Sequence, residues 1–288
     1  MNTSMIRYIL GHVLKIEAIL LLLPCLTAVY YQEIQGVYYL LTAAICIVLG
    51  FLMTLRKPKN NVFYLKEGCV ATALSWMFLS VFGCLPFVFS REIPSFTNAL
   101  FETISGFTTT GASILEDVEA LSHCALLWRS FTHWIGGMGV LVFLLAIVPM
   151  SGGSNINLMR AESPGPSVGK LVPKMVSSAR ILYGIYFGLT LLEAVSLVLG
   201  GMPLFDSVAT SFGTAGTGGF GIKADSFAGY AVHLQWIVTI FMILFGVNFN
   251  AYYFILFHQF RKAFGMEEVR AYFIVILASV AFITCNIR

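Results

Sequence analysis

Long apolar runs recur along this chain, and each is long enough to cross a lipid bilayer as a helix. A membrane-spanning helix needs roughly 20 consecutive, mostly apolar residues. Six runs meet this requirement, and a seventh begins near Ala271; the six lie at 6–31, 36–54, 68–90, 124–150, 180–200 and 232–258. With 58% hydrophobic and 11% charged residues, the composition is too apolar for a soluble domain. The chain is therefore predicted to be an all-α integral membrane protein.

Basic residues gather in alternate connections between these runs. Eleven Lys and Arg residues lie in the connections at 55–67, 151–180 and 259–270, whereas the connections on the other side carry only Arg91 and Lys223. Cytoplasmic connections are enriched in Lys and Arg, so the N-terminus is predicted to be cytoplasmic. The opposite side carries eight acids: Glu33, Glu92, Glu102, Glu116, Asp117, Glu119, Asp206 and Asp225. These acids could concentrate cations at an outer vestibule, or they could simply be solvated loop residues.

The chain also contains an internal repeat. Spanning run 68–90 is followed by a short amphipathic helix at 95–107, the loop T-T-T-G-A-S and another spanning run. Run 180–200 is followed by a short helix at 203–213, the loop T-A-G-T-G-G-F-G and a further run. The short helices begin alike, with A-L-F-E-T-I-S from Ala99 and P-L-F-D-S-V-A from Pro203. Each unit therefore reads as helix, half-helix, polar loop and helix.

Polar loops at membrane depth are tolerated only where protein buries them or where they line a water-filled path. A re-entrant loop held by a short helix can direct backbone carbonyls at a cation and replace its hydration shell. Glycine permits the positive φ angles that such a loop needs, and the carboxyl end of each short helix adds a negative dipole. An ordinary extracellular turn is the simpler alternative, but two loops in one repeated frame favour a cation path.

Three motifs resemble those of the Trk/Ktr/HKT superfamily of potassium transporters, and most closely its TrkH group, the membrane subunits of bacterial Trk uptake systems. The motifs are F-E-T-I-S-G-F-T-T-T-G-A-S (101–113), W-R-S-F-T-H-W-I-G-G-M-G (128–139) and S-F-G-T-A-G-T-G-G-F-G (211–221). The resemblance implies a pore of four helix–pore helix–filter loop–helix units around one ion path. It divides the chain into two N-terminal helices (1–55), a first pore repeat (67–150), a cytoplasmic loop (151–179), a second repeat (180–262) and the start of a third (263–288).

The resemblance also implies which residues bind the ion. Potassium would bind at carbonyls of filter residues in both loops: Thr108, Thr109, Thr110, Gly111 and Ala112, and Ala215, Gly216, Thr217, Gly218 and Gly219. The register of the second loop is open. Counting from Phe107 and Phe212 pairs Gly111 with Gly216, whereas the G-G-F ending makes Gly218 or Gly219 the filter glycine, and we favour Gly218.

Three charged residues are predicted to support the loops. Arg129, costly inside a membrane unless paired, is expected to bind an acid such as Glu102 or Glu116 and to brace the first loop. Snorkelling of Arg129 to the headgroups is the alternative. Asp206 matches Glu102 in the repeat and is assigned a similar role. His133, one turn beyond Arg129, is expected to be a hydrogen-bonded packing residue rather than a proton carrier.

The resemblance implies a multi-pass protein of the bacterial inner membrane, surrounded by lipid and paired as a homodimer. A cytosolic, TrkA-like nucleotide-binding subunit would regulate it, while this chain would bind no cofactor, no nucleic acid and only potassium as substrate. Glycines 152–153 do not form a phosphate-binding loop, because the G-x-x-x-x-G-K-[ST] frame is absent. Coupling of transport to protons or sodium, as in a symporter, is left open.

The chain departs from the family pattern because it holds two repeats and the first helix of a third. We expect a truncated product or partial chain, although two copies could instead pair to supply four loops. The alternatives to a potassium uptake subunit are a non-conducting fragment that assembles with other subunits and a transporter permeable to both potassium and sodium. An enzyme is not expected, because the sequence has no H-E-x-x-H metal pair and no paired aspartates within its apolar runs.

Overall fold

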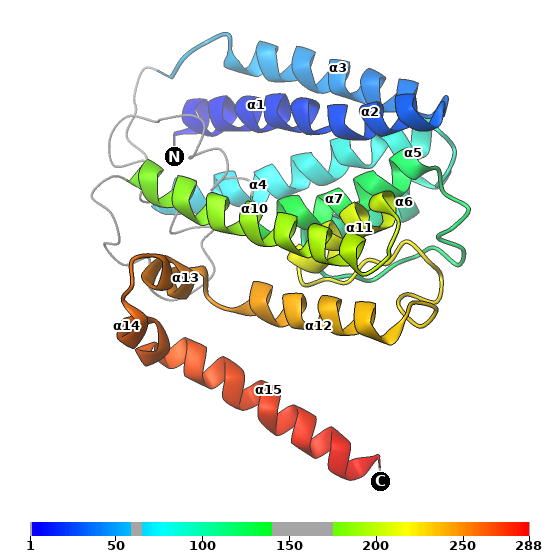
Figure 1. Cartoon of the computed structure of the whole chain (residues 1–288). Coiled ribbons are helices and arrows are strands. Elements are labelled where there is room, and N and C mark those ends of the chain that lie inside the picture. The colour runs from blue at the N-terminus through cyan, green and yellow to red at the C-terminus, as the bar shows by residue number, and fades with distance from the viewer. Residues whose placement is uncertain (1, 59–64, 140–174, 288) are drawn as a thin grey trace.

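The computed structural model describes residues 2–58, 65–139 and 175–287, and its regular elements are all helices (Figure 1). No strand occurs in those three ranges, which confirms the predicted all-α class. Within them, five helical segments are long and apolar enough to cross a membrane, or six if one bent pair counts as a span. The sequence predicted six spans and a seventh near Ala271; the predicted run at 124–150 lies partly outside the described residues.

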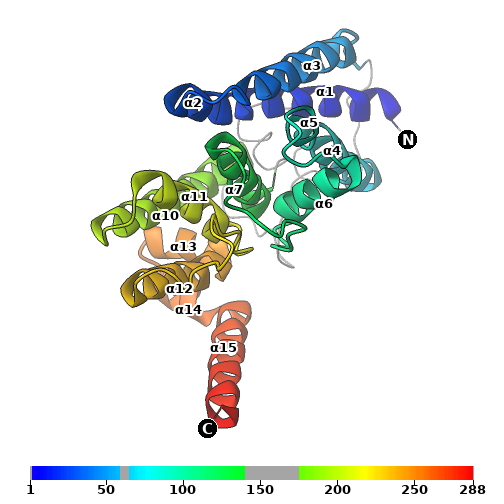
Figure 2. The same cartoon turned by 90° about the vertical axis from the view of Figure 1, so that its right-hand side faces the viewer.

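The chain begins with an antiparallel hairpin. Helix α1 (Thr3–Leu20) continues as α2 (Leu22–Tyr31), and α3 (Gly36–Thr54) returns alongside them (Figures 1 and 2). Helices α1 and α3 approach each other closely at glycines, since a Cβ on Gly50 would lie 2.7 Å from the carbonyl oxygen of Gly11. Small residues allow such close approach of membrane helices.

Two similar units follow the hairpin. The first comprises α4 (Leu65–Gly83), α5 (Leu85–Phe89), α6 (Phe96–Phe107) and α7 (His123–Met138). The second comprises α10 (Met175–Leu199), α11 (Leu204–Ala215), α12 (Val232–Gly246) and α13 (Phe249–Leu256). In both units a 12-residue helix, α6 or α11, is followed by an irregular loop that leads into the next long helix. We call residues 108–122 the first loop and residues 216–231 the second loop.

Both loops lie at the same end of the bundle, on the right-hand side of Figure 1, together with the turn between α2 and α3. We call this end the loop end. Helix α6 begins at the loop end. Ser95 caps its first turn by accepting a hydrogen bond from the N–H of Asn98. The helix then runs into the bundle, and the first loop brings the chain back to the start of α7. The predicted half-helices therefore exist, with the re-entrant course expected of them.

The predicted single span at 232–258 is wrong as one helix, because α12 and α13 are bent by 90° relative to each other. Val247 adopts an extended conformation that ends α12. The side chain of Asn248 then accepts a hydrogen bond from the N–H of Asn250, at 2.9 Å, and begins α13 as a new helix. The amide of Asn248 also donates to Glu268, which ties the bend to the last helix.

Several predicted boundaries also shift. The last helix, α15 (Glu267–Asn286), begins before Ala271, and the predicted border between 262 and 263 falls inside α14 (Phe260–Gly265). Helix α10 begins at Met175 rather than 180. The border between 150 and 151, and most of the predicted cytoplasmic loop, lie outside the described residues.

Candidate functional site

The two loops leave their short helices with the same backbone conformation. Two residues after the end of α6, Thr109 has φ +54, and Gly111 has φ +76. Two residues after the end of α11, Thr217 has φ +55, and Gly219 has φ +73. The left-handed conformation is uncommon for threonine, so its recurrence at one position in both units is a shared, specific feature.

One hydrogen bond at the helix ends repeats in the same register, although the next one, from Thr110 to Ser105, has its counterpart from Gly219 to Gly213, one residue later. The N–H of Thr109 donates to the carbonyl of Gly106 at 2.9 Å, and the N–H of Thr217 donates to that of Thr214 at 2.8 Å. The backbone therefore pairs Gly111 with Gly219, one residue beyond the Gly218 that we favoured from the sequence, and it does not pair Gly111 with Gly216.

The other residues predicted to form the filter lie next to these left-handed residues in the chain. Thr108 and Gly216 are the C-caps of α6 and α11, Ala215 is the last residue of α11, and Ala112 is exposed. The hydroxyls of Thr108 and Thr110 lie 2.8 Å apart.

The two loops touch each other directly. A Cβ on Gly111 would lie only 2.0 Å from the carbonyl oxygen of Gly218. Helix α7 packs behind both loops through adjacent glycines: a Cβ on Gly136 would lie 2.3 Å from the carbonyl oxygen of Phe107, and one on Gly137 would lie 3.0 Å from that of Ala215. The W-I-G-G-M-G run therefore places α7 against the ends of both short helices.

A buried ion pair lies beside the first loop. The Nε of Arg129 is 2.5 Å from the Oε1 of Glu102, and the two residues are 4% and 1% exposed. Glu102 also accepts hydrogen bonds from the hydroxyl of Ser113, at 3.0 Å, and from the N–H of Ile114, at 2.9 Å. Of the two acids proposed for Arg129, the structure pairs it with Glu102, and Arg129 does not snorkel.

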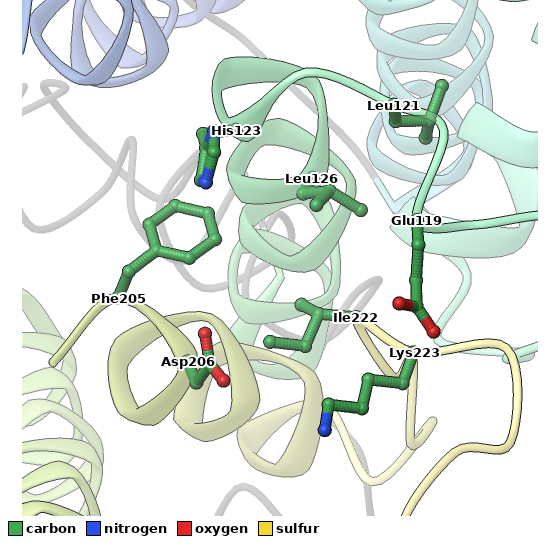
Figure 3. A pocket seen from close by; sticks show the side chains of 8 residues that line it. All are labelled: Glu119, Leu121, His123, Leu126, Phe205, Asp206, Ile222 and Lys223. Carbon is green, nitrogen blue, oxygen red and sulfur yellow. The ribbon is translucent and has the colours of Figure 1, made fainter. Parts of the chain in front are cut away.

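Asp206 lies elsewhere. Its carboxylate accepts a hydrogen bond from the hydroxyl of Tyr230 at 3.1 Å. It lines a pocket of about 200 Å³ at the loop end, between the starts of α7 and α11 (Figure 3). The pocket is lined by Glu119, Leu121, His123, Leu126, Phe205, Asp206, Ile222 and Lys223. The structure therefore brings Glu102 and Arg129 together but places Asp206 with a different set of side chains.

Two of the acids at the loop end cap helix α7. Glu33, in the turn between α2 and α3, accepts hydrogen bonds from the N–H groups of His123 and Cys124, at 2.8 and 3.0 Å, and from the His123 ring. Glu92 accepts one from the N–H of Ser122 at 2.7 Å. Carboxylates are stabilising at a helix N-terminus, where unpaired N–H groups and the positive dipole end meet. No sequence pattern predicts these contacts, which cross 30 to 91 positions.

Acidification is expected to destabilise the fold through Glu33. Burial would raise the pKa of this carboxyl, but its hydrogen bonds from Cys124 and His123 outweigh burial and hold the pKa below the ordinary value of 4.5. Because the folded-state pKa is lowered, this stabilisation is complete above the ordinary value and is lost as pH falls through the folded-state pKa. Thermal unfolding of the purified protein in detergent, from about pH 7 to about pH 3, measures the loss.

The variant Glu33→Gln tests the assignment. It is expected to lose about 1 kcal/mol of stability at neutral pH and to have a flatter pH profile in this range. Glu116→Gln changes an exposed acid of the first loop and serves as the matched control. A Glu33→Gln profile as steep as that of the unmodified chain would contradict the prediction.

Comparisons with known proteins agree with this architecture. The profile of a family described as TrkH, cation transport protein, matches residues 36–283. The Trk system potassium uptake protein TrkH of Escherichia coli (strain K12) is 34% identical over 260 residues, which are 88% of this chain and 53% of that protein. The Trk system potassium uptake protein TrkG of the same strain is 31% identical, over 99% of this chain and 60% of that protein.

A solved structure has the same fold. The crystal structure of the potassium transporter TrkH from Vibrio parahaemolyticus matches with a TM-score of 0.82 and 28% identity. The match covers 98% of this chain and 59% of that one. The chain thus spans between half and three-fifths of the length of these relatives.

Proposed function

This chain belongs to the TrkH family of cation transport proteins, and from that premise we propose that it forms part of a pore that moves potassium ions across the bacterial inner membrane. The observation that carries the proposal is the pair of loops with matched left-handed residues, Thr109 with Gly111 and Thr217 with Gly219. Left-handed residues that alternate with other conformations let successive carbonyls turn toward one side. Carbonyls so arranged can replace the water around a dehydrated cation.

The proposed filter uses the backbone of both loops. Thr108 to Gly111 supply the carbonyls of the first strand, and Gly216 to Gly219 supply those of the second, with Gly219 as the counterpart of Gly111. Helices α6 and α11 end at these strands, so their negative dipole ends add to the attraction for a cation. The Glu102–Arg129 pair supports the first strand from behind.

We also propose how the chain is placed in the membrane and what it assembles with. The excess of Lys and Arg away from the loop end supports a cytoplasmic N-terminus, so that the loop end faces outward. The relatives are named as Trk system proteins, which supports a cytosolic, TrkA-like regulatory partner. Two loops supply half of a four-stranded filter, and further repeats or a second copy would supply the rest.

Potassium uptake by cells that lack their own potassium transporters tests the proposal. The chain is expressed alone and as a hybrid, in which the carboxyl-terminal part of E. coli TrkH continues it beyond the matched region. We expect the hybrid to restore growth at low potassium. Growth with the chain alone would mean that two copies complete the pore. If neither form restores growth while both reach the membrane, the potassium assignment is wrong.

A further inference from the structure

Phe220 directly follows the second filter strand and is held by two side chains of α7. The guanidinium carbon of Arg129 lies 3.7 Å from the centre of the Phe220 ring. The ring of His133 stacks on Phe220 at 3.9 Å, with 14° between the planes. Both groups therefore contact the Phe220 ring. Arg129 and His133 are one helical turn apart, and Phe220, only 2% exposed, contacts both.

Arg129 reaches the end of the second strand as well as the first loop. Its Nη1 donates to the carbonyl of Gly221 at 2.7 Å, while its Nε binds Glu102. Glu102 in turn holds the first loop through Ser113 and Ile114. One guanidinium therefore joins the exits of the two filter strands, through a fork of donors that lysine does not have.

His133 lies directly behind the second strand. A Cβ on Gly218 would lie 2.2 Å from the Cε1 of His133, and one on Gly216 would lie 2.6 Å from its carbonyl oxygen. The ring edge of Phe220 also reaches the first short helix, where a Cβ on Gly106 would lie 3.6 Å from it. The stack formed by Arg129, Phe220 and His133 thus contacts the second strand and the short helix of the first unit, and it reaches the first loop through Glu102.

We propose that Arg129, Phe220 and His133 are positioning residues that fix the second filter strand relative to the first, so that the two strands select the ion as one unit. The inference rests on the proposed potassium pore. A carbonyl filter distinguishes potassium from sodium through the number and spacing of its oxygens. A second strand released from the stack would lose its fixed distance from the first, and discrimination against sodium would fall while transport continued.

The test measures potassium and sodium transport rates in whichever form, chain alone or hybrid, restores potassium uptake. Phe220→Leu removes the ring that both partners contact. Arg129→Lys keeps a positive charge for Glu102 but loses the flat, forked group that stacks on Phe220 and reaches Gly221. We expect each variant to lower the potassium-to-sodium ratio about tenfold, as loss of a buried cation–ring contact would. Both substitutions remove the same contact between Arg129 and Phe220. The double variant is therefore expected to be no less selective than the less selective of the two single variants.

Two further variants separate this role from a general loss of structure. Phe227→Leu changes a partly buried phenylalanine further along the second loop and is expected to leave the ratio unchanged. His133→Phe keeps a stacking ring and is expected to retain most of the selectivity, whereas His133→Ala is not. Membrane amounts of each variant are measured by immunoblot. If Phe220→Leu does not reach the membrane, Arg129→Lys and His133→Ala carry the test.

The outcomes separate the two proposals. An unchanged ratio in Phe220→Leu or, where that variant is absent from the membrane, in Arg129→Lys would overturn the inference but leave the potassium pore intact. Additive losses in the double variant would also overturn it, because the residues would then act independently. Failure of the unmodified protein to take up potassium would instead remove the proposed function.

Discussion

Replacing Gly111 with alanine is expected to reduce potassium uptake by well over tenfold. At φ +76 a side chain costs about 1–2 kcal/mol in backbone energy alone. The added methyl group would also lie 2.0 Å from the carbonyl oxygen of Gly218. Backbone atoms cannot rotate away as a flexible side chain can, so the backbone of one of the two loops would have to move. Each 1.4 kcal/mol corresponds to about a tenfold change, and the collision adds to the conformational cost.

Uptake of potassium or rubidium by cells lacking their own transporters measures this effect, with membrane amounts checked by immunoblot. Gly188→Ala is the matched control, because no described atom lies within 4 Å of a Cβ at that helical glycine. Gly219→Ala is expected to impair uptake through its own positive φ, with little collision, since the nearest atom to its Cβ is a methionine methyl at 3.8 Å. Full uptake by Gly111→Ala would show that this contact is not part of the ion path.

Replacing Glu102 with glutamine is expected to destabilise the protein by about 3–5 kcal/mol, because Arg129 would remain buried without its carboxylate. Glutamine has one acceptor oxygen where the carboxylate has two, so the substitution removes the charge together with one acceptor. The double variant Glu102→Gln, Arg129→Gln removes both charges and is expected to recover part of the stability. Thermal unfolding in detergent measures all three proteins.

Glu116→Gln, an exposed acid of the same loop, is the control for this series and is expected to unfold like the unmodified protein. If Glu102→Gln were as stable as this control, the pair would have no structural role. A double variant less stable than Glu102→Gln alone would show that Arg129 is stabilised mainly by Gly221 and Phe220 rather than by Glu102.

The membrane class and the repeated unit were predictable because both depend on local patterns. Apolar length marks a spanning helix, and the two short helices were placed within one or two residues of their observed bounds, Phe96–Phe107 and Leu204–Ala215. The pairing of Arg129 with an acid was also predictable from its position within an apolar run, since a charge in the membrane needs a partner.

The register between the repeats was wrong by about one helical turn. The sequence match set Ala99 against Pro203, but Ala99 is the fourth residue of α6, whereas Pro203 precedes the first residue of α11. A displacement of four residues brings the same helix face into line, so the apolar pattern looks correct. The same error paired Glu102 with Asp206, although the residue at the position of Glu102 in α11 is Thr210.

Contacts between distant segments could not be predicted. Arg129 reaches Gly221 across 92 positions, and no local pattern marks a guanidinium for a backbone carbonyl. The bend at Val247 was missed because the residues around it are apolar enough to continue a helix. Asn248 is the single capping signal there, and its second partner, Glu268, lies 20 residues further on.

The cap that Glu33 provides for α7 has a consequence for biosynthesis. Glu33 lies 90 positions before His123, so the hairpin that carries it leaves the ribosome well before α7 does. Chains fold from the amino end during synthesis. We therefore expect the N-terminal hairpin to be in place before α7 is inserted, so that Glu33 is available to cap the amide groups of α7 as the first unit is assembled.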